Sequence, residues 1–287
     1  MTSFIDELNR IKMKHCHFSL VYNDLPYLKQ KLPFLYDNFD QLIFYDLSAF
    51  DGKYQYSQDG SHEFIKEYPD PEGKITLIEL RHGLQFVKEL NGPTNRTKLK
   101  MATYANKFIK DNIDVFWTTD MDEFFNVYLM REVEYILDKY PEVNNIGTDH
   151  YLFWNNFDTI MCEGTTKGAY PWKLNRIARH KPGRRYSHCD LQERYPKEYR
   201  AGNMIYHFSS VGKEKTLNKL FNFYSGTNEK YKDIWNEFEN VEMEHGKLYG
   251  YPNAHQSIPN MGFLKYFGHI KQELPYIDFD TLKKDIL

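Results

Sequence analysis

The sequence of 287 residues has few cysteines, and none of them form a recognisable pair. Cys16, Cys162 and Cys189 lie far apart, and no Cys-x-x-Cys spacing occurs. Metal sites built on closely spaced thiols are therefore excluded, and an odd number of scattered cysteines indicates reduced thiols. We therefore expect a cytoplasmic protein.

Long apolar runs and targeting signals are also missing. No segment has the roughly 18 consecutive apolar residues that a membrane-spanning helix requires, so no transmembrane segment is expected. Residues 1–7 lack a basic region and no apolar stretch follows them, which predicts no signal peptide. A net charge of −3 gives no general attraction to nucleic acid or to membrane surfaces.

Aromatic residues, in contrast, are abundant. They make up 17% of the chain, with 23 tyrosines and 21 phenylalanines, within an apolar content of 41%. Such a composition predicts a packed core together with a tyrosine-lined cleft. The length permits one large domain or two small ones.

The first half of the chain alternates between strand patterns and helix patterns. Strands are predicted at residues 17–22, 41–46, 74–79 and 113–119. Helices are predicted at residues 24–38 (bent or broken at Pro33), about 94–110 and 127–140. This alternation indicates right-handed βαβ crossovers and an α/β fold with a mostly parallel sheet.

The remaining segments are less regular. Residues 52–73 are rich in Gly, Pro, Asp and Ser and are expected to form a loop. Further strands are predicted at 145–153 and 204–209, and a further helix from Lys213 to Gly226. The tail from about residue 235 shows no clear period.

The stretch from Val115 to Phe125 is the most informative part of the sequence. An apolar run ends in two carboxylates, Asp120 and Asp122, and a helical pattern follows. Two hard oxygen ligands at the end of a buried strand suit Mg²⁺ or Mn²⁺, and such an ion would bridge phosphates. The alternative is that Asp122 caps a helix beginning near Phe124.

Polar residues follow three of the predicted strands at the same end. They are Tyr22 to Asp24, Asp46 to Ser48, and Asp120 to Asp122. Ligands of parallel α/β sheets bind beyond the carboxyl ends of the strands. We therefore expect these residues to converge at one edge of the sheet.

These patterns resemble the nucleotide-sugar-dependent glycosyltransferases of the GT-A fold, closest to family 2 and to family 92-like enzymes. The sequence Trp-x-x-Asp-x-Asp-Glu-Phe, which begins at Trp117, carries the resemblance together with the later His207. The resemblance covers roughly residues 15–226. It implies one GT-A domain at residues 1–226, with a Rossmann-like, mostly parallel sheet flanked by helices. A nucleotide-sugar half would lie at about 15–125 and an irregular acceptor half at about 126–226. A C-terminal extension, residues 227–287, would pack on this domain.

The resemblance also implies a metal site and a donor site. Asp120, Asp122 and His207 would hold Mn²⁺ or Mg²⁺. Glu123 would orient these ligands without binding the ion itself. The residues expected to contact the nucleotide-sugar, most simply a UDP-sugar, are Tyr22, Asn23, Asp46, Asp51, Lys100, Asn106, Asp120 and Lys219. The alternatives are a core position for His207, a turn for Asp51, and an exposed helix face for Lys100 and Asn106.

Sugar transfer also needs a base that takes the proton of the acceptor hydroxyl. The families resembled are inverting, but the Glu-Asp pair usual in family 2 is absent here. Asp149, Asp158, Glu163 and Asp190 are the candidates, of which Asp190, and after it Asp158, are taken as catalytic. A surface role for Asp190 is the alternative.

A basic segment of the sequence indicates what kind of acceptor the protein uses. Residues 173–200 contain nine Lys or Arg against three acidic residues. We expect a glycan, a lipid-linked or another polyanionic acceptor, including a nucleic acid with a hydroxylated base. Alternatively, these cations serve the donor diphosphate or are simply solvated.

Two other classes of function remain open. One is a non-catalytic module that binds a sugar or a partner protein through tyrosines. The other is phosphoryl transfer of the Asp-x-Asp-x-Thr type, which the sequence disfavours because its motif follows about the fourth strand and lacks the threonine. Neither the sugar nor the oligomeric state follows from the sequence.

Overall fold

The computed structural model describes residues 11–46, 55–78, 101–163, 172–183, 197–212, 261–265 and 268–287. Contacts divide the chain into two discontinuous units. Unit 1 comprises residues 1–121, 125–149 and 173–204, and unit 2 comprises residues 122–124, 150–172 and 205–287. The predicted domain boundary near residue 226 lies outside the described residues and stays a prediction.

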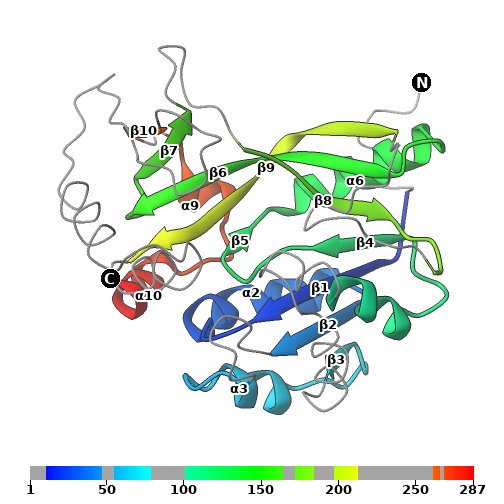
Figure 1. Cartoon of the computed structure of the whole chain (residues 1–287), viewed down its shortest axis with the longest axis horizontal. Helices are drawn as coiled ribbons and strands as arrows, with labels where there is room; N and C mark the ends of the chain where they lie inside the picture. The colour runs from blue at the N-terminus through cyan, green and yellow to red at the C-terminus, as the bar shows by residue number, and fades with distance from the viewer. Residues whose placement is uncertain are drawn as a thin grey trace. The chain divides into compact units, whose positions relative to one another are not determined.

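Unit 1 is built on a parallel sheet (Figure 1). Its strands include β1 (His15–Val21), β2 (Gln41–Asp46), β3 (Ile75–Ile78), β4 (Val115–Thr118) and most of β8 (Trp172–Arg179), and it also holds the first residues of β6 (Asn145–Asn155) and β9 (Glu198–Val211). Four of them pair in parallel in the order β3-β2-β1-β4, and β8 is antiparallel to β4. The order β3-β2-β1, with β4 on the other side of β1, is that of a Rossmann-like sheet. The predicted α/β class with a Rossmann-like sheet flanked by helices is confirmed.

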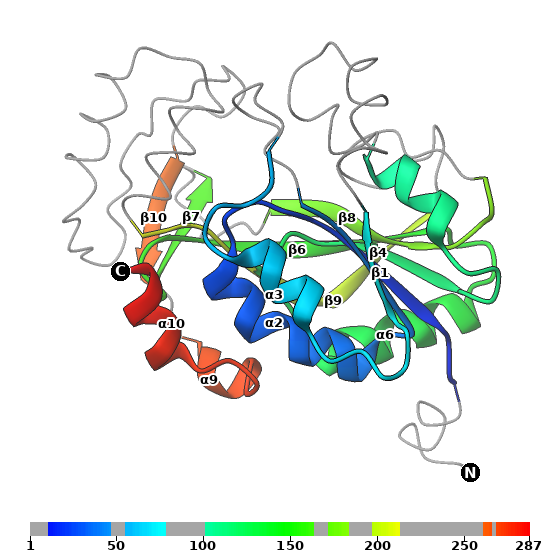
Figure 2. The same ribbon diagram turned by 90° about the horizontal axis from the view of Figure 1, so that it is seen from below.

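The helices of unit 1 cover both faces of this sheet (Figure 2). They are α2 (Leu25–Asn38), α3 (Ser61–Glu67), a helical turn at 101–105 that leads into η1 (Asn106–Phe108), and α6 (Val127–Lys139). On one face, Met101 and Ala105 pack against Cys16 and Phe18 of β1. Burial raises the pKa of the Cys16 thiol, which keeps it protonated and unreactive.

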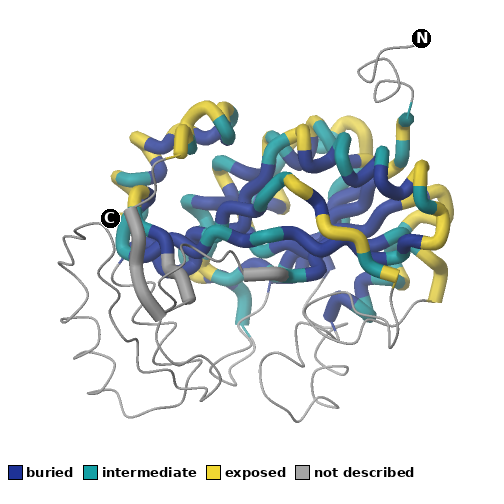
Figure 3. The backbone as a smooth tube through the Cα atoms, turned by 90° about the horizontal axis from the view of Figure 1, so that it is seen from above, coloured by how far each residue is buried: buried dark blue, intermediate teal, exposed yellow. Residues whose placement is uncertain are grey.

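The opposite face of β1 carries polar side chains, because alternate residues of a strand point to opposite sides. His15 and His17 both lie against the ring of Phe39, which follows α2. His15 also contacts Glu134 of α6 at 3.2 Å and accepts a hydrogen bond from the indole of Trp117. The buried strands β1, β2 and β4 run through the interior of the unit (Figure 3).

Two elements of unit 1 differ from the sequence predictions. Helix α2 runs without interruption through Pro33, because Leu28, Leu32 and Leu35 are fully buried and their packing offsets the lost hydrogen bond. Helix α3 lies within the predicted loop 52–73. It has only seven residues, too few to give a periodic pattern.

Unit 2 contains antiparallel strands and two C-terminal helices. Its elements are β5 (Glu123–Phe124), the ends of β6 (Asn145–Asn155) and β9 (Glu198–Val211), β7 (Thr159–Glu163), β10 (Met261–Lys265), α9 (Ile270–Glu273) and α10 (Phe279–Ile286). Strand β5 pairs with β9, and β7 pairs with both β6 and β10. Phe157 packs edge-on against Phe208 and Phe279, which ties α10 to the strands. Part of the tail without a clear period is therefore helical.

The predicted helix from Lys213 to Gly226 lies outside the described residues. Within the described ranges, no helix combines the length and the apolar character that crossing a bilayer requires.

Candidate functional site

A cluster of metal-binding side chains lies in unit 2, where β5 pairs with β9. Glu123 and His207 are direct partners in this antiparallel pair, so their side chains share one face of it. His150 of β6 joins them, with its ring centroid 6.2 Å from that of His207. We call Glu123, His150 and His207 the Glu-His-His cluster. It could hold a metal ion, and its ligand atoms lie within 4.8 Å of one another.

The distances in the cluster suit a divalent cation. Oε1 of Glu123 is 3.8 Å from Nδ1 of His207 and 4.0 Å from Nδ1 of His150. Ligands that bind one ion at about 2.1 Å are held roughly 3 to 4 Å apart, so a small inward shift completes such a site. Glu123 and His150 are fully buried, and a buried carboxylate is costly unless a cation or hydrogen bonds compensate it.

Asp122 lies on the other side of the same histidine. Its Oδ1 is 3.4 Å from Nε2 of His207, and both side chains are about one-tenth exposed, at 11% and 12%. Its backbone carbonyl accepts a hydrogen bond from Phe208 N at 2.8 Å, which anchors Asp122 to β9. Within unit 2, the structure therefore brings together two of the three predicted metal ligands, Asp122 and His207.

The capping role considered for Asp122 is wrong. Helix α6 begins at Val127, and its N-cap is Asn126, whose side chain accepts a hydrogen bond from Leu129 N at 3.1 Å. Residues 123–124 form β5, so no helix begins near Phe124. The apolar spacing after residue 127 predicts the helix correctly, but the asparagine cap was not predicted.

Asp120, the remaining predicted metal ligand, belongs to unit 1 and already has a cationic neighbour. Its Oδ2 lies 3.7 Å from Nη2 of Arg176 on β8, a side chain only 5% exposed. Asp120 itself is 29% exposed, so it remains accessible to a ligand. The proximity of a buried guanidinium makes Asp120 a weaker cation ligand than its position in the motif suggests.

The carboxyl ends of β1 and β2 bring Tyr22, Asn23 and Asp46 to one edge of unit 1, since Val21 is the register partner of Asp46. Asn23 has a φ of 54°, a left-handed conformation that asparagine tolerates better than most residues. Its side-chain oxygen accepts a hydrogen bond from Gln58 N at 2.7 Å, and the Tyr22 hydroxyl accepts one from Gln55 at 3.3 Å.

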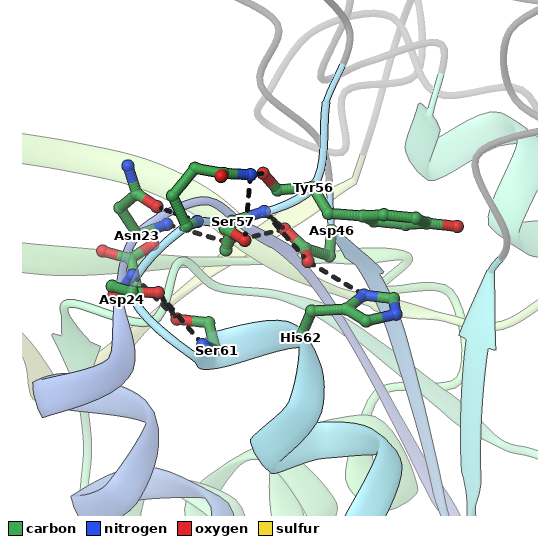
Figure 4. A network of polar contacts seen from close by, with 9 residues as sticks. Asn23, Asp24, Asp46, Tyr56, Ser57, Ser61 and His62 are labelled. Atoms are coloured by element: carbon green, nitrogen blue, oxygen red, sulfur yellow. Dashed lines mark hydrogen bonds and ion pairs between the residues drawn. The ribbon is translucent and has the colours of Figure 1, made fainter.

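Asp46 is the centre of a buried polar network at this edge (Figure 4). It accepts hydrogen bonds from the backbone N–H of Ser57 at 3.0 Å and from its hydroxyl at 2.6 Å. Nδ1 of His62 lies 3.0 Å from the other carboxylate oxygen, and the Tyr56 ring lies 3.9 Å from the His62 ring. Burial raises the pKa of Asp46, although these hydrogen bonds and the nearby His62 oppose the shift.

The other predicted residues are dispersed or lie outside the described ranges. Asp158 is exposed in the turn after β6, and Asp149 pairs with Arg200. Asn106 begins η1 in a half-buried position. For Glu163, only its place at the end of β7 is described. The predicted residues outside the described ranges are Asp51, Lys100, Asp190 and Lys219.

Sequence reasoning missed three residues of these clusters. His150 gave only a weak signal, an isolated histidine in a predicted strand. Arg176 was counted only as one charge of a basic segment, and the histidine of the Asp46 network, His62, falls in a predicted loop. All three are brought to their partners by long-range folding, which residue spacing does not reveal.

Comparisons with known proteins add little. Neither a protein-family profile nor a curated protein sequence matches the chain. One similar solved structure is the crystal structure of mannose-1-phosphate geranyltransferase from Thermus thermophilus. Its TM-score is 0.30 and its identity 9%, over 81% of this chain and 66% of that one. The chain thus spans slightly less than two thirds of that protein, and a likeness this weak carries no argument about function.

Proposed function

We propose that the protein is a metal-dependent glycosyltransferase that moves a sugar from a nucleotide-sugar, most simply a UDP-sugar, to an acceptor hydroxyl. The Glu-His-His cluster carries this proposal. Its Glu123 follows directly on the Asp120-x-Asp122 motif in the sequence, and its His207 contacts both Asp122 and Glu123. A motif that occurs often by chance gains weight when its second aspartate contacts a histidine that belongs to a cluster of metal-ligand types.

The donor set favours a transition metal. Imidazole nitrogens suit borderline ions better than Mg²⁺, which prefers oxygen ligands, whereas carboxylates also suit Mn²⁺. Asp122, Glu123, His150 and His207 would hold Mn²⁺ in preference to Mg²⁺. When bound, the ion would neutralise the charge that develops on the departing diphosphate.

Unit 1 supplies the proposed nucleotide contacts. Its strand order and its polar edge are those of a nucleotide-binding half, with Tyr22, Asn23 and Asp46 at the strand ends. Asp46 is fully buried and engaged by Ser57 and His62, so it would act on the nucleotide indirectly, by holding residues 55–62 beside β1 and β2. Tyr22, partly exposed, and the exposed Asn23 would contact the ribose or the base.

The proposed reaction inverts the anomeric centre. The acceptor oxygen attacks the anomeric carbon while the bond from that carbon to the phosphate oxygen breaks, and its electron pair leaves with the diphosphate. A carboxylate of the chain takes the acceptor proton. Asp158 and Asp190 are the proposed bases, and Asp158 is the more readily tested because it is described and exposed.

The acceptor is proposed to be a glycan, a lipid-linked molecule or a polyanion. Three of the basic residues in 173–200 are engaged within unit 1: Arg176 with Asp120, Arg179 with the carbonyls of Val143 and Leu137, and Arg200 with Asp149. Lys181 and Lys197 are exposed and accessible to an anion. The cationic surface is thus smaller than the sequence count indicates.

A thermal-shift panel tests the function. UDP-, GDP- and dTDP-sugars are each added with Mn²⁺, with Mg²⁺ and with a chelator. A ligand that binds only the folded state raises the midpoint by mass action. We expect one nucleotide-sugar to raise it with Mn²⁺ and to lose most of the effect with the chelator. If no donor shifted the midpoint, the result would count against the transferase and in favour of a non-catalytic module.

A further inference from the structure

A lysine is completely buried in the middle of helix α2. Lys31 is 0% exposed and stands among the apolar residues that pack this helix on the sheet, Leu28, Leu32 and Leu35. Removing an ammonium from water costs several kcal/mol even after the protein relaxes around it. A methionine of similar length would fill the space without that cost, so packing alone gives no reason for a lysine.

The ammonium of Lys31 reaches the segment that leaves β4. Nζ donates to the hydroxyl of Thr119 at 2.8 Å and to the backbone carbonyl of Asp120 at 2.5 Å. Two side chains of β1 hold the same segment: Nε2 of His17 lies 2.6 Å from the Thr119 hydroxyl, and the Ser19 hydroxyl donates to the carbonyl of Thr119. All of these groups belong to unit 1.

Asp120 is therefore held at both ends. Lys31 fixes its peptide carbonyl from the helix side, and Arg176 of β8 faces its carboxylate. The Lys31 ammonium also lies 5.6 Å from the centre of the Phe125 ring, a distance at which an aromatic face attracts a cation. Contacts from two elements therefore bear on Asp120: α2 holds its carbonyl through Lys31, and β8 faces its carboxylate through Arg176.

We propose that Lys31 is a positioning residue, whose buried ammonium fixes the peptide of Asp120 and so sets how Asp120 is presented to the donor. The inference rests on the proposed transferase function and extends it. It assigns the lysine no contact with substrate, because its action passes through Asp120.

The first experiment needs neither substrate nor metal. Amide hydrogen exchange across residues 117–124 is compared in the wild type, Lys31→Met and Lys29→Met. Lys29 is an exposed lysine of the same helix and serves as the matched control. We expect faster exchange in this segment for Lys31→Met and no change for Lys29→Met. Unchanged exchange in Lys31→Met would overturn the proposal.

The second experiment measures Mn²⁺-dependent donor hydrolysis or transfer per folded molecule. Small displacements of a catalytic group can lower rates by about 10- to 100-fold, and we expect kcat/KM of Lys31→Met to fall within this range. In an Asp120→Asn background, Lys31→Met should add little, because both changes remove the same contribution. If the losses of kcat/KM were additive in the double variant, or if Lys31→Met lowered Tm but left activity normal, Lys31 would only stabilise the fold and would not position Asp120.

A milder variant guards against misfolding. Lys31→Gln keeps an N–H donor without the charge, so it should recover part of the exchange protection and part of the activity if Lys31→Met proves too unstable. An inactive wild type would remove the transferase function. If exchange at 117–124 still responded to Lys31 and not to Lys29, the positioning role itself would stand.

Discussion

At the scale of single residues, the main feature is the way buried charges are compensated. Glu123 lies between two imidazoles, Asp46 between a serine and a histidine, and Lys31 against a hydroxyl and a carbonyl. Each buried group would be costly alone, and each is surrounded by groups of the opposite polarity. Their burial does not follow from residue type, since a buried and an exposed carboxylate look the same in a sequence.

Replacing His207 by alanine should abolish Mn²⁺ binding, because this residue faces both Asp122 and Glu123. Replacing His150 by glutamine removes a proposed imidazole ligand, so it should weaken binding by at least the roughly 10- to 100-fold that the loss of a supporting residue costs. Isothermal titration with Mn²⁺ measures both effects. His269→Gln is the control, since His269 is exposed in the same unit. Wild-type affinity in His150→Gln would remove that histidine from the site.

Glu134 makes stability depend on pH. Burial alone would raise its pKa, but hydrogen bonds from His15, Arg131 and Met13 N lower it overall. A lowered folded pKa gives stability that is complete above the unfolded pKa and is lost as the pH falls below about 5. Glu134→Gln should therefore lower the free energy of unfolding at pH 7 by about 1.5–3 kcal/mol.

Urea unfolding at a series of pH values checks this expectation. The difference between the wild type and Glu134→Gln should shrink on acidification, because the wild-type glutamate then becomes neutral as well. Glu142→Gln, at an exposed position, should follow the wild type throughout. A difference that stayed constant with pH would show that ionisation of Glu134 contributes nothing.

At the scale of elements, helix α6 is capped by Asn126 and not by Asp122. Substitutions at these two positions should therefore have opposite effects on stability and on Mn²⁺ binding. Asn126→Ala removes the cap and should cost about 1 kcal/mol of stability, which Asn126→Ser restores. Asp122→Ala should leave the stability nearly unchanged and remove the stabilisation by Mn²⁺. Chemical unfolding with and without Mn²⁺ measures both, and a strongly destabilised Asp122→Ala would indicate a structural role for this carboxylate instead of a role in metal binding.

The elements that the sequence predicted share one property: each has a run or a regular spacing of apolar residues. Strands β2 and β4 are short, mostly apolar runs, β1 alternates polar and apolar residues, and α6 repeats its buried residues at Leu129, Val133 and Leu137. Helix α3 and strand β5 lack such a pattern, since they have seven and two residues. Their structures are decided by what they pair with, and the partner of β5 lies more than 80 residues away in β9.

The burial of one polar residue, Lys31, could have been predicted from the sequence. Lys31 occupies the helical spacing of Tyr27, Leu28, Leu32 and Leu35, so its burial could have been inferred from the period of α2. Its partners could not. The bonds to Thr119 and Asp120 span 88 and 89 residues of sequence, and only the parallel pairing of β1 with β4 makes them possible.

At the scale of the whole molecule, the distribution of charge affects which acceptors the protein can bind. The chain is acidic overall, and several cations of the basic segment are engaged internally. If the acceptor is a polyanion, its KM should rise steeply between about 50 and 200 mM salt, because each phosphate contact releases counterions. Steady-state rates across this range provide the measurement. A flat response would leave an uncharged glycan as the acceptor, and Lys197→Gln should then have no effect on KM.

The pairing of Glu123 with His207 has a consequence for how this chain can change over evolution. Side chains along a strand alternate between two faces, so losing one residue within β9 would either turn His207 away from Glu123 or slide the whole strand against β5. Selection should therefore remove insertions and deletions of one residue within β5 and β9. Changes of two residues could be tolerated, because they keep His207 and Glu123 on the same face of the pair. Homologous chains that keep the chemistry are expected to differ in length outside β5 and β9.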